Sequence, residues 1–393
     1  LPAVQQYFLT NDDSVTNYWL NEGAGGWRMD VMGDASFPNG YWETFRAEVK
    51  ETKSDAIIIS ETWQKDSTLL RMLRGDRADT TMNYRLRDAV LGLLSTGSFD
   101  SKGFGDSVRI LAPSEFASRL ESIREDYPDA AYYSLMNLLD SHDTERILWA
   151  LTPGDQTRAD KEFNAANLAE GKQRQRSASL IQFTVPGAPT VFYGDEVGVT
   201  GDDDPDDRRT YPWLDKGGKP DASLLLHYTK LNWLRKTAPV LVNGDFKVLL
   251  ADDASGIVVY GRKTQSQAAL VIINRSNATQ TGVIPVAGYL PDGVSLYRFE
   301  IAQAKARGVL GLGFGSRELE RRAAAVPLFF NAVQALSEGN FVPVRGGVLI
   351  RNAQGALLGS VGVSGDTSAN DELCAIAGIK AVTLVADCGD PLS

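Results

Sequence analysis

Short apolar runs alternate with stretches of helical periodicity over the first 238 residues. Phe116, Leu120, Ile123 and Tyr127 recur at helical spacing, between one proline before them and one after. Similar periodicity predicts helices at residues 42–53, 84–94, 158–181 and 223–235. Continuous apolar runs, which are typical of strands buried on both faces, occur at residues 25–31, 55–61, 133–139 and 189–196. Strands that alternate with helices in this way predict a parallel sheet with helices outside it.

The pattern changes after residue 238. Short β-rich runs predict an antiparallel unit that ends near residue 300, with strands at residues 246–252, 256–262, 268–275 and 282–288. Beyond it we expect helices at residues 301–313 and 316–333, strands at 341–352, 356–363 and 381–386, and a helix at 371–382. The predicted fold class is therefore α/β in three parts: an α/β domain at residues 1–238, an antiparallel β domain at 239–299 and an α+β module at 300–393.

The composition is that of a globular protein with a large core. Of 393 residues, 43% are hydrophobic and 23% are charged. A net charge of −10 without a dense basic block argues against binding to nucleic acid or to an anionic membrane surface. The chain has no apolar run of membrane-spanning length and shows no signal peptide, so we expect a soluble protein of undetermined compartment. Its 2 Cys and 2 His residues argue against a disulfide framework and a His-rich metal site.

Acidic residues follow three of the predicted strands. Arg28 and Asp30 are two positions apart and so point to the same side of a strand. An arginine beside a carboxylate keeps it ionised, as a nucleophile requires. Glu61 follows an apolar run, and desolvation raises the pKa of a carboxyl, which suits a general acid. His142 and Asp143 follow the third strand directly.

Two carboxyls in different environments are what glycoside hydrolysis requires. In the retaining type, one carboxylate attacks the sugar while the other carboxyl protonates the leaving group. In parallel β/α barrels the active site lies at the C-terminal ends of the strands, where Asp30, Glu61 and Asp143 are expected. Three acids in order, each after an apolar strand, favour this interpretation over three unrelated solvated loop residues.

Three segments resemble the second, third and fourth signature regions of glycoside hydrolase family 13, the α-amylase family: GWRMDV, IIISETW and NLLDSHDTER. Within that family the resemblance is to the neopullulanase, cyclomaltodextrinase and amylopullulanase group. Two further segments of this chain look like the eighth strand of that group and the loop after it: PTVFYGDEVG and DDDPDDRRTYPW. The resemblance covers about residues 1–299. It implies a TIM-type β/α barrel and a retaining hydrolase of α-1,4 links in starch, maltooligosaccharides, cyclomaltodextrins or pullulan.

The resemblance also implies a role for each matching residue. Asp30 is the expected nucleophile, Glu61 the acid/base and Asp143 the acid that stabilises the transition state. Arg28 is expected to orient the nucleophile, and His142 to hydrogen-bond sugar hydroxyls. These roles make an α-glucan the expected partner.

Two other side chains carry open alternatives. Trp63 either stacks on a sugar near the leaving group or packs in the wall of the site. Arg208 either reaches a sugar or pairs with an acid of its own loop. The acidic run at residues 202–207 lacks the spacing of an EF-hand, so we interpret it as a solvated loop and not as a calcium site.

The sequence also departs from the family pattern. The first signature region, which supplies an Asn calcium ligand and sugar-contacting His and Asp residues in relatives, is absent. We therefore expect a partial barrel that lacks its first strands, has no metal site, and is impaired in substrate affinity and rate. The alternative is a catalytically weak or inactive glucan-binding relic. Such a sheet has open edges. We expect the C-terminal module or a second subunit to fill the gap left by the missing strands, and we expect the protein to be a homodimer.

The last segment carries a second resemblance. NFVPVRGGVLIRNAQGALLGSVGVSG, followed by the helix start near Asp371, is similar to the HbpS/GlcG-like family, which includes haem-binding proteins. The similarity covers about residues 300–393. No haem-ligand motif is present there, because both histidines lie outside it and Cys374 falls in a predicted helix. We expect no cofactor, and favour a packing or assembly role over binding of haem or another small ligand.

Overall fold

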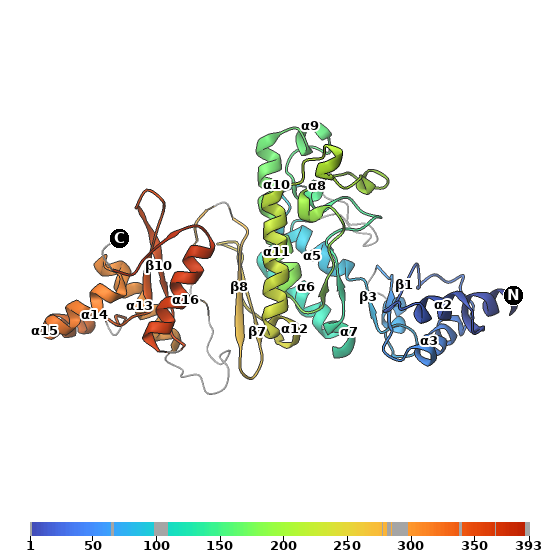
Figure 1. The fold of residues 1–393 in the computed structure, drawn as a ribbon, viewed down its shortest axis with the longest axis horizontal. Helices are drawn as coiled ribbons and strands as arrows, with labels where there is room; N and C mark the ends of the chain where they lie inside the picture. The colour runs from blue at the N-terminus through green and yellow to red at the C-terminus, as the bar shows by residue number, and fades with distance from the viewer. Residues whose placement is uncertain are drawn as a thin grey trace. The chain divides into compact units, whose positions relative to one another are not determined.

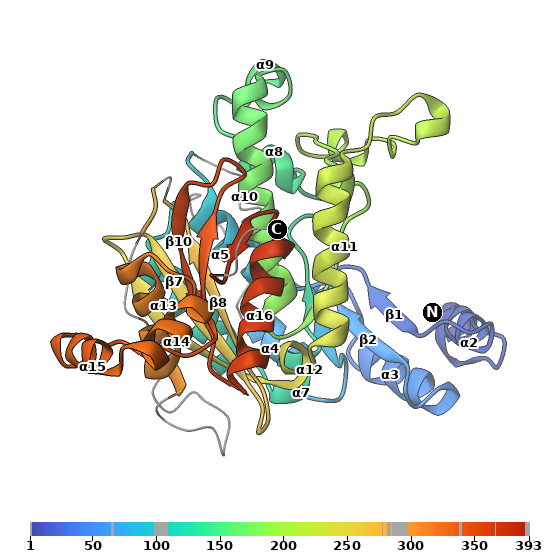
Figure 2. The same ribbon diagram turned by 60° about the vertical axis from the view of Figure 1, so that its left-hand side comes forward.

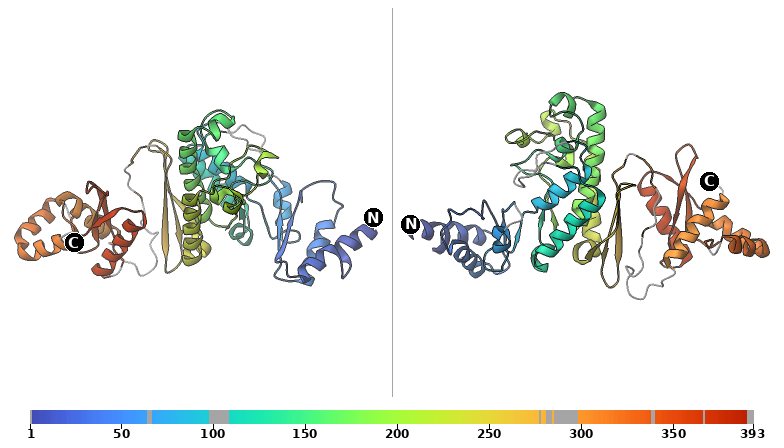
Figure 3. Two further views of the ribbon diagram at one scale, coloured as in Figure 1. Left: turned by 45° about the horizontal axis from the view of Figure 1, so that its top comes forward. Right: turned by 180° about the vertical axis from the view of Figure 1, so that it is seen from behind.

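The computed structural model describes residues 2–63, 67–97, 109–276, 278–280, 284, 298–337, 340–365 and 367–389. The chain forms two compact units, Leu1–Tyr289 and Leu290–Ser393 (Figures 1, 2 and 3). The strand expected at residues 282–288 lies outside the described residues, apart from position 284.

Strands and helices alternate through most of the first unit (Figure 1). Its elements before the antiparallel sheet are α1 (Pro2–Gln5), η1 (Gln6–Thr10), α2 (Val15–Asn21), β1 (Gly26–Met29), α3 (Tyr41–Thr52), β2 (Ile57–Ser60), α4 (Ser67–Met72), β3 (Thr80–Thr81), α5 (Tyr84–Leu94), α6 (Pro113–Asp126), α7 (Asp129–Tyr133), β4 (Met136–Asn137), α8 (Ile147–Leu151), α9 (Arg158–Lys161), α10 (Ala165–Thr184), β5 (Ala188–Pro189), η2 (Asp195–Val197), η3 (Asp206–Arg208), η4 (Leu214–Lys216), α11 (Ala222–Thr237) and α12 (Pro239–Asn243).

The strands of this α/β part pair in parallel and in chain order. β1, β2 and β3 form one parallel sheet, and β4 pairs with β5 in another. A parallel bridge between Met82 and Met136 links the two sheets. The α/β character expected from the alternation is confirmed. β3 was not predicted, because its two threonines follow a charged stretch and show no apolar run.

Side-chain caps explain where several helices begin. The Asn83 side chain accepts the N–H of Leu86 at the start of α5. The single helix predicted for residues 158–181 is wrong, since the structure has α9 and α10 there. The Asn164 side chain accepts the N–H groups of Ala166 and Asn167 and so starts α10 as a new helix.

An antiparallel sheet follows within the same unit. β6 (Asp245–Asp252), β7 (Ile257–Lys263) and β8 (Ala268–Asn274) pair in sequence order, which confirms the expected antiparallel strands. Phe246, Tyr260 and Ile273 belong to the same buried cluster as side chains of the parallel strands and their helices. The antiparallel strands and the α/β part therefore share a core.

The second unit has its own sheet and cores. Its elements are α13 (Arg298–Leu312), α14 (Ser316–Ala325), α15 (Pro327–Leu336), β9 (Gly347–Arg351), β10 (Leu357–Gly362), α16 (Ser368–Ala381) and β11 (Val385–Asp387). Its strands pair antiparallel in the order β10-β9-β11. The single helix predicted for residues 316–333 is wrong, since the chain breaks at Val326 before Pro327, which cannot continue a helix. None of the helices described in either unit is long and apolar enough to cross a membrane.

Two parallel strands carry an open edge. Within the described residues, β1 and β5 each have a strand neighbour on one side only. Because an unpaired edge offers free N–H and C=O groups to another chain, we expect a two-fold dimer in solution. Light scattering at micromolar concentration should give about twice the 42.7 kDa of the chain. A mass equal to that of one chain would contradict this prediction.

Candidate active site

One arginine holds two carboxyl groups together at the ends of neighbouring strands. Asp30 follows β1 and Glu61 follows β2, and the parallel register sets Met29 opposite Ser60, so the two acids leave the sheet side by side. Nη1 of Arg28 lies 2.7 Å from Oδ1 of Asp30, and Nη2 lies 2.8 Å from Oε1 of Glu61. The guanidinium therefore bridges both acids.

The two carboxyls have different environments. The side chain of Asp30 is 73% exposed, whereas that of Glu61 is 4% exposed. Glu61 accepts hydrogen bonds from the backbone N–H of Val31 at 2.9 Å and from Nε1 of Trp63 at 3.0 Å. A hydrogen bond with Glu61 and another with Arg28 lower the pKa of Asp30 below its usual value. Asp30 is thus an ionised, accessible carboxylate beside a buried and firmly held one.

The backbone is strained next to Asp30. Val31 has a φ of 38°, a left-handed conformation that is rare for a β-branched residue and costs about 1–3 kcal/mol. This conformation accompanies the hydrogen bond from the Val31 N–H to Glu61. Nothing in the sequence signals it, since such turns usually carry glycine or asparagine.

Tyr84 connects Trp63 to the segment that follows β4. Its ring stacks on Trp63 with centroids 3.8 Å apart and planes inclined by 13°. Its hydroxyl lies 3.3 Å from Oγ of Ser141, which accepts the backbone N–H of Asp143. Burial raises the pKa of Tyr84 to about 12, so its phenol stays neutral. Wall packing of Trp63 is therefore present on the ring face that Tyr84 covers, and sugar stacking on its other face remains a prediction.

His142 and Arg208 both lie beside Asp143. Nε2 of His142 is 3.3 Å from Oδ2 of Asp143, and Nη2 of Arg208 is 3.6 Å from Oδ1. Arg208 also pairs with Asp204 of its own loop at 2.8 Å. His142 is close enough to Asp30 that its protonated form lowers the pKa of that carboxyl. The structure thus brings Arg28, Asp30 and Glu61 into one group and His142, Asp143 and Arg208 into a second group near it.

A buried network that the sequence analysis missed supports the second group. Arg146 is fully buried, and its Nη1 lies 3.2 Å from Asp195 and donates to the carbonyl of Tyr193. Its Nε donates to the carbonyl of Asp207 at 2.6 Å. Asp140 accepts the N–H of Ile147, and burial raises the pKa of both Asp140 and Asp195. Arg146 therefore ties the segment of His142 and Asp143 to the loop of Arg208.

Two acids of the loop at residues 202–207 make ion pairs at its surface, whereas Asp207 is fully buried, so the expectation of a solvated loop is wrong at that position. Asp204 pairs with Arg208, and Asp206 pairs with Arg209. Among the described residues, no three or more His, Cys, Asp or Glu side chains are grouped so as to hold a metal ion.

The second unit has no histidine or methionine that could ligate a haem. Both histidines and all five methionines of the sequence lie before residue 228. The remaining sulfur ligands there are Cys374, which is exposed, and Cys388. We therefore assign no chemistry to a haem in this chain.

Two family models match the chain. The model described as "Alpha amylase, catalytic domain" matches residues 2–216, more than half of the 393 residues. The model described as "Haem degrading protein HbpS-like" matches residues 263–380. The resemblances to both families noted in the sequence are confirmed.

Characterised relatives point the same way. The chain is 36% identical over 304 residues to an amylopullulanase of Thermoanaerobacterium saccharolyticum, a match that covers 73% of this chain and 23% of that one. It is 33% identical over 286 residues to a cyclomaltodextrinase of Geobacillus thermopakistaniensis, with 72% and 42% of the two chains covered. The chain thus spans less than half the length of these two relatives.

Solved structures are similar in fold. A debranching enzyme from Nostoc punctiforme superposes with a TM-score of 0.60 at 27% identity, over 73% of this chain and 54% of that one. The cyclic α-maltosyl-(1→6)-maltose hydrolase of Arthrobacter globiformis gives 0.55 at 29% identity, over 67% and 52% of the chains.

Proposed function

The chain belongs to the α-amylase family of glycoside hydrolases, and from that premise we propose that it is a retaining hydrolase of α-1,4-glucosidic bonds. The observation that carries the proposal is the Arg28 bridge, which joins an exposed carboxylate, Asp30, to a buried carboxyl, Glu61. Retaining glycosidases need this pair, one acid to attack and one to move a proton.

The geometry supports a distinct role for each acid. Asp30 attacks the anomeric carbon, while Glu61 gives a proton to the glycosidic oxygen of the departing chain. The bond from that carbon to the leaving oxygen breaks as the bond to Asp30 forms. Glu61 then takes a proton from a water molecule, which attacks the same carbon and releases Asp30. Arg28 keeps Asp30 in its charged form before the attack and again after water has released it from the sugar.

The second group completes the proposed site. Asp143 adds negative charge that favours the positively charged transition state, while His142 and Arg208 offer donors to sugar hydroxyls. We place these residues at the C-terminal ends of strands in part of a TIM-type barrel. The parallel pairs β1 with β2, β2 with β3 and β4 with β5 agree with this placement.

Release of reducing sugar from four substrates tests the proposal. Wild type should hydrolyse soluble starch, maltoheptaose, a cyclomaltodextrin or pullulan, since relatives are named for such activities. Proton NMR of the first product should show the α-anomer, as retention demands. The β-anomer would exclude a glycosyl-Asp30 intermediate. Release at background level from all four substrates would favour a glucan-binding protein without activity.

The pH dependence of kcat/KM should reveal the effect of Arg28 on the pKa of Asp30. The pKa of Asp30 lies below its ordinary value of 3.8, so the acid limb of the profile should also lie below that pH. In Arg28→Gln the carboxylate loses a cationic partner, its pKa rises, and the acid limb moves to higher pH. Arg28→Lys keeps a positive charge and serves as the control, with a smaller shift. An acid limb that Arg28→Gln leaves in place would contradict this assignment.

A further inference from the structure

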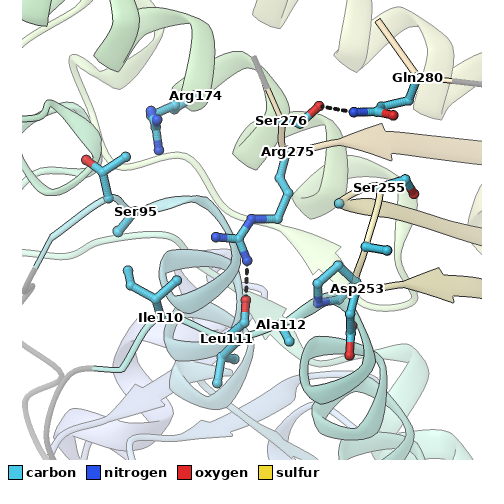
Figure 4. Close-up of a pocket in the computed structure, with 14 residues that line it drawn as sticks. Ser95, Ile110, Leu111, Ala112, Arg174, Asp253, Ser255, Arg275, Ser276 and Gln280 are labelled. Atoms are coloured by element: carbon cyan, nitrogen blue, oxygen red, sulfur yellow. Dashed lines mark hydrogen bonds between the residues drawn. The ribbon is translucent and has the colours of Figure 1, made fainter. Parts of the chain in front are cut away.

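A cavity lies between the α/β part and the antiparallel strands of the first unit. Its volume is about 690 Å³, within the usual range of small-molecule sites. It is lined by the end of α5, the residues before α6, helix α10, the β6–β7 turn and the chain after β8 (Figure 4). None of the proposed catalytic acids lines it, so it is distinct from the candidate active site.

Two guanidinium groups enter this cavity from different elements. Arg174 comes from α10, where it pairs with Glu170 at 2.5 Å, and Arg275 follows the end of β8 (Figure 4). The side chain of Arg275 donates to the backbone carbonyl of Leu111 and, within the described residues, pairs with no carboxylate. Burial and the charge of Arg174 both lower the pKa of Arg275. Glu170 already compensates part of the charge of Arg174, and an anion beside Arg275 would offset the remaining repulsion between the two guanidinium groups.

The rest of the lining favours a polar anion over a neutral glucan. Thr96 supplies a hydroxyl, and the Ser95 Oγ is buried with no hydrogen-bond partner among the described residues. The hydroxyls of Ser255 and Ser276 also line the cavity, but they already donate to Asp252 and Asn274. No described residue of the lining is aromatic, so the cavity has no ring on which a glucan could stack.

The one acid of the lining is already engaged. The carboxylate of Asp253 accepts the backbone N–H of Ser114 at 2.8 Å and its hydroxyl at 2.7 Å, at the start of α6. A helix N-terminus favours a negative charge, so α6 partly compensates the charge of Asp253. The Asp253 carboxylate therefore repels an anion in the cavity less than an uncompensated carboxylate would.

We propose that this cavity binds a phosphoryl group, held between Arg174 and Arg275 with the hydroxyls of Ser95 and Thr96 as further donors. The planar fork of arginine matches the oxygens of a phosphoryl group, and such charge-assisted hydrogen bonds are the strong ones. The group can arrive as free phosphate or as the monoester of a small sugar, for which the cavity has room.

Titration calorimetry of the full chain distinguishes these sources. Inorganic phosphate and glucose 6-phosphate are expected to bind, and glucose is not. Tighter binding of the ester identifies a sugar phosphate as the ligand, and equal binding identifies phosphate itself. Arg275→Gln should weaken binding by about tenfold or more, the usual effect of losing one charged hydrogen bond. Binding of glucose as tight as that of its phosphate, or no binding of either anion at millimolar concentration, would overturn the proposal.

A second pair of variants leaves the hydrogen bond from Arg275 to the Leu111 carbonyl in place. Ala254 lies exposed on the β6–β7 turn and lines the cavity. Ala254→Glu adds a negative charge there and should abolish phosphate binding, while Ala254→Gln, of the same size without the charge, should keep it. Thermal unfolding shows whether both variants are folded. Equal affinity of the two folded variants for phosphate would overturn the proposal.

Discussion

Glu61→Gln should lose roughly 10²–10⁴-fold in kcat on unactivated α-glucans, the usual contribution of general acid–base catalysis. The amide cannot give a proton to the glycosidic oxygen. Because it has the same size as the carboxyl, it preserves the shape of the site, although its single oxygen can accept only one of the two hydrogen bonds that Val31 and Trp63 donate to separate oxygens of Glu61. We therefore expect substrate binding to survive. Initial rates of reducing-sugar release from maltoheptaose give the measurement.

The leaving group supplies the control for Glu61→Gln. Fluoride departs without a proton, so an α-maltosyl fluoride should form the covalent intermediate in the variant at a rate much closer to that of wild type. A loss of kcat below threefold on maltoheptaose would count decisively against Glu61 as the acid. An equal loss on both substrates would indicate a damaged fold.

Asp30→Asn should reduce activity further than Glu61→Gln does. Without the carboxylate no covalent bond to the sugar can form, so every substrate is affected, including the fluoride. We expect kcat to fall by more than the roughly 10²–10⁴-fold of an acid–base residue, to the background of the assay. Rates on both maltoheptaose and the fluoride provide the comparison.

Asp34 offers a matched control for this variant. It lies exposed in the same loop, four residues beyond Asp30, and its carboxylate accepts the N–H of Ser36. Asp34→Asn should keep activity within a few-fold of wild type. If the two asparagine variants lost activity equally, the loss would report on the loop and not on a nucleophile.

Local patterns in the sequence predict much of the fold. Apolar runs and helical spacing place β1, β2, β4 and most helices, because these signals depend on residues close together in the chain. They miss β3 and overlap β5 only at Pro189. A spacing of two residues places Arg28 and Asp30 on one side of a strand, and their ion pair is present at 2.7 Å. Where a short polar side chain starts a new helix, as at Asn164, periodicity alone runs two helices together.

The parts of the site that escaped prediction depend on distant contacts. Tyr84 reaches Trp63 on one side and Ser141 on the other, although 57 positions separate it from Ser141. Arg146 pairs with Asp195 across 49 positions. One sequence gives no signal for such pairs. The left-handed Val31 is also unpredictable, because local strain persists only where surrounding contacts enforce it.

Covalent trapping tests the central claim most directly. A fluorinated α-glycosyl fluoride combines a good leaving group with a fluorine that slows the second step, so the glycosyl-enzyme accumulates. Intact-mass spectrometry of wild type should show the addition of one glycosyl group, and peptide mapping should place it on Asp30. Unmodified protein after prolonged incubation, or a label on another residue, would contradict retaining hydrolysis through Asp30 and Glu61.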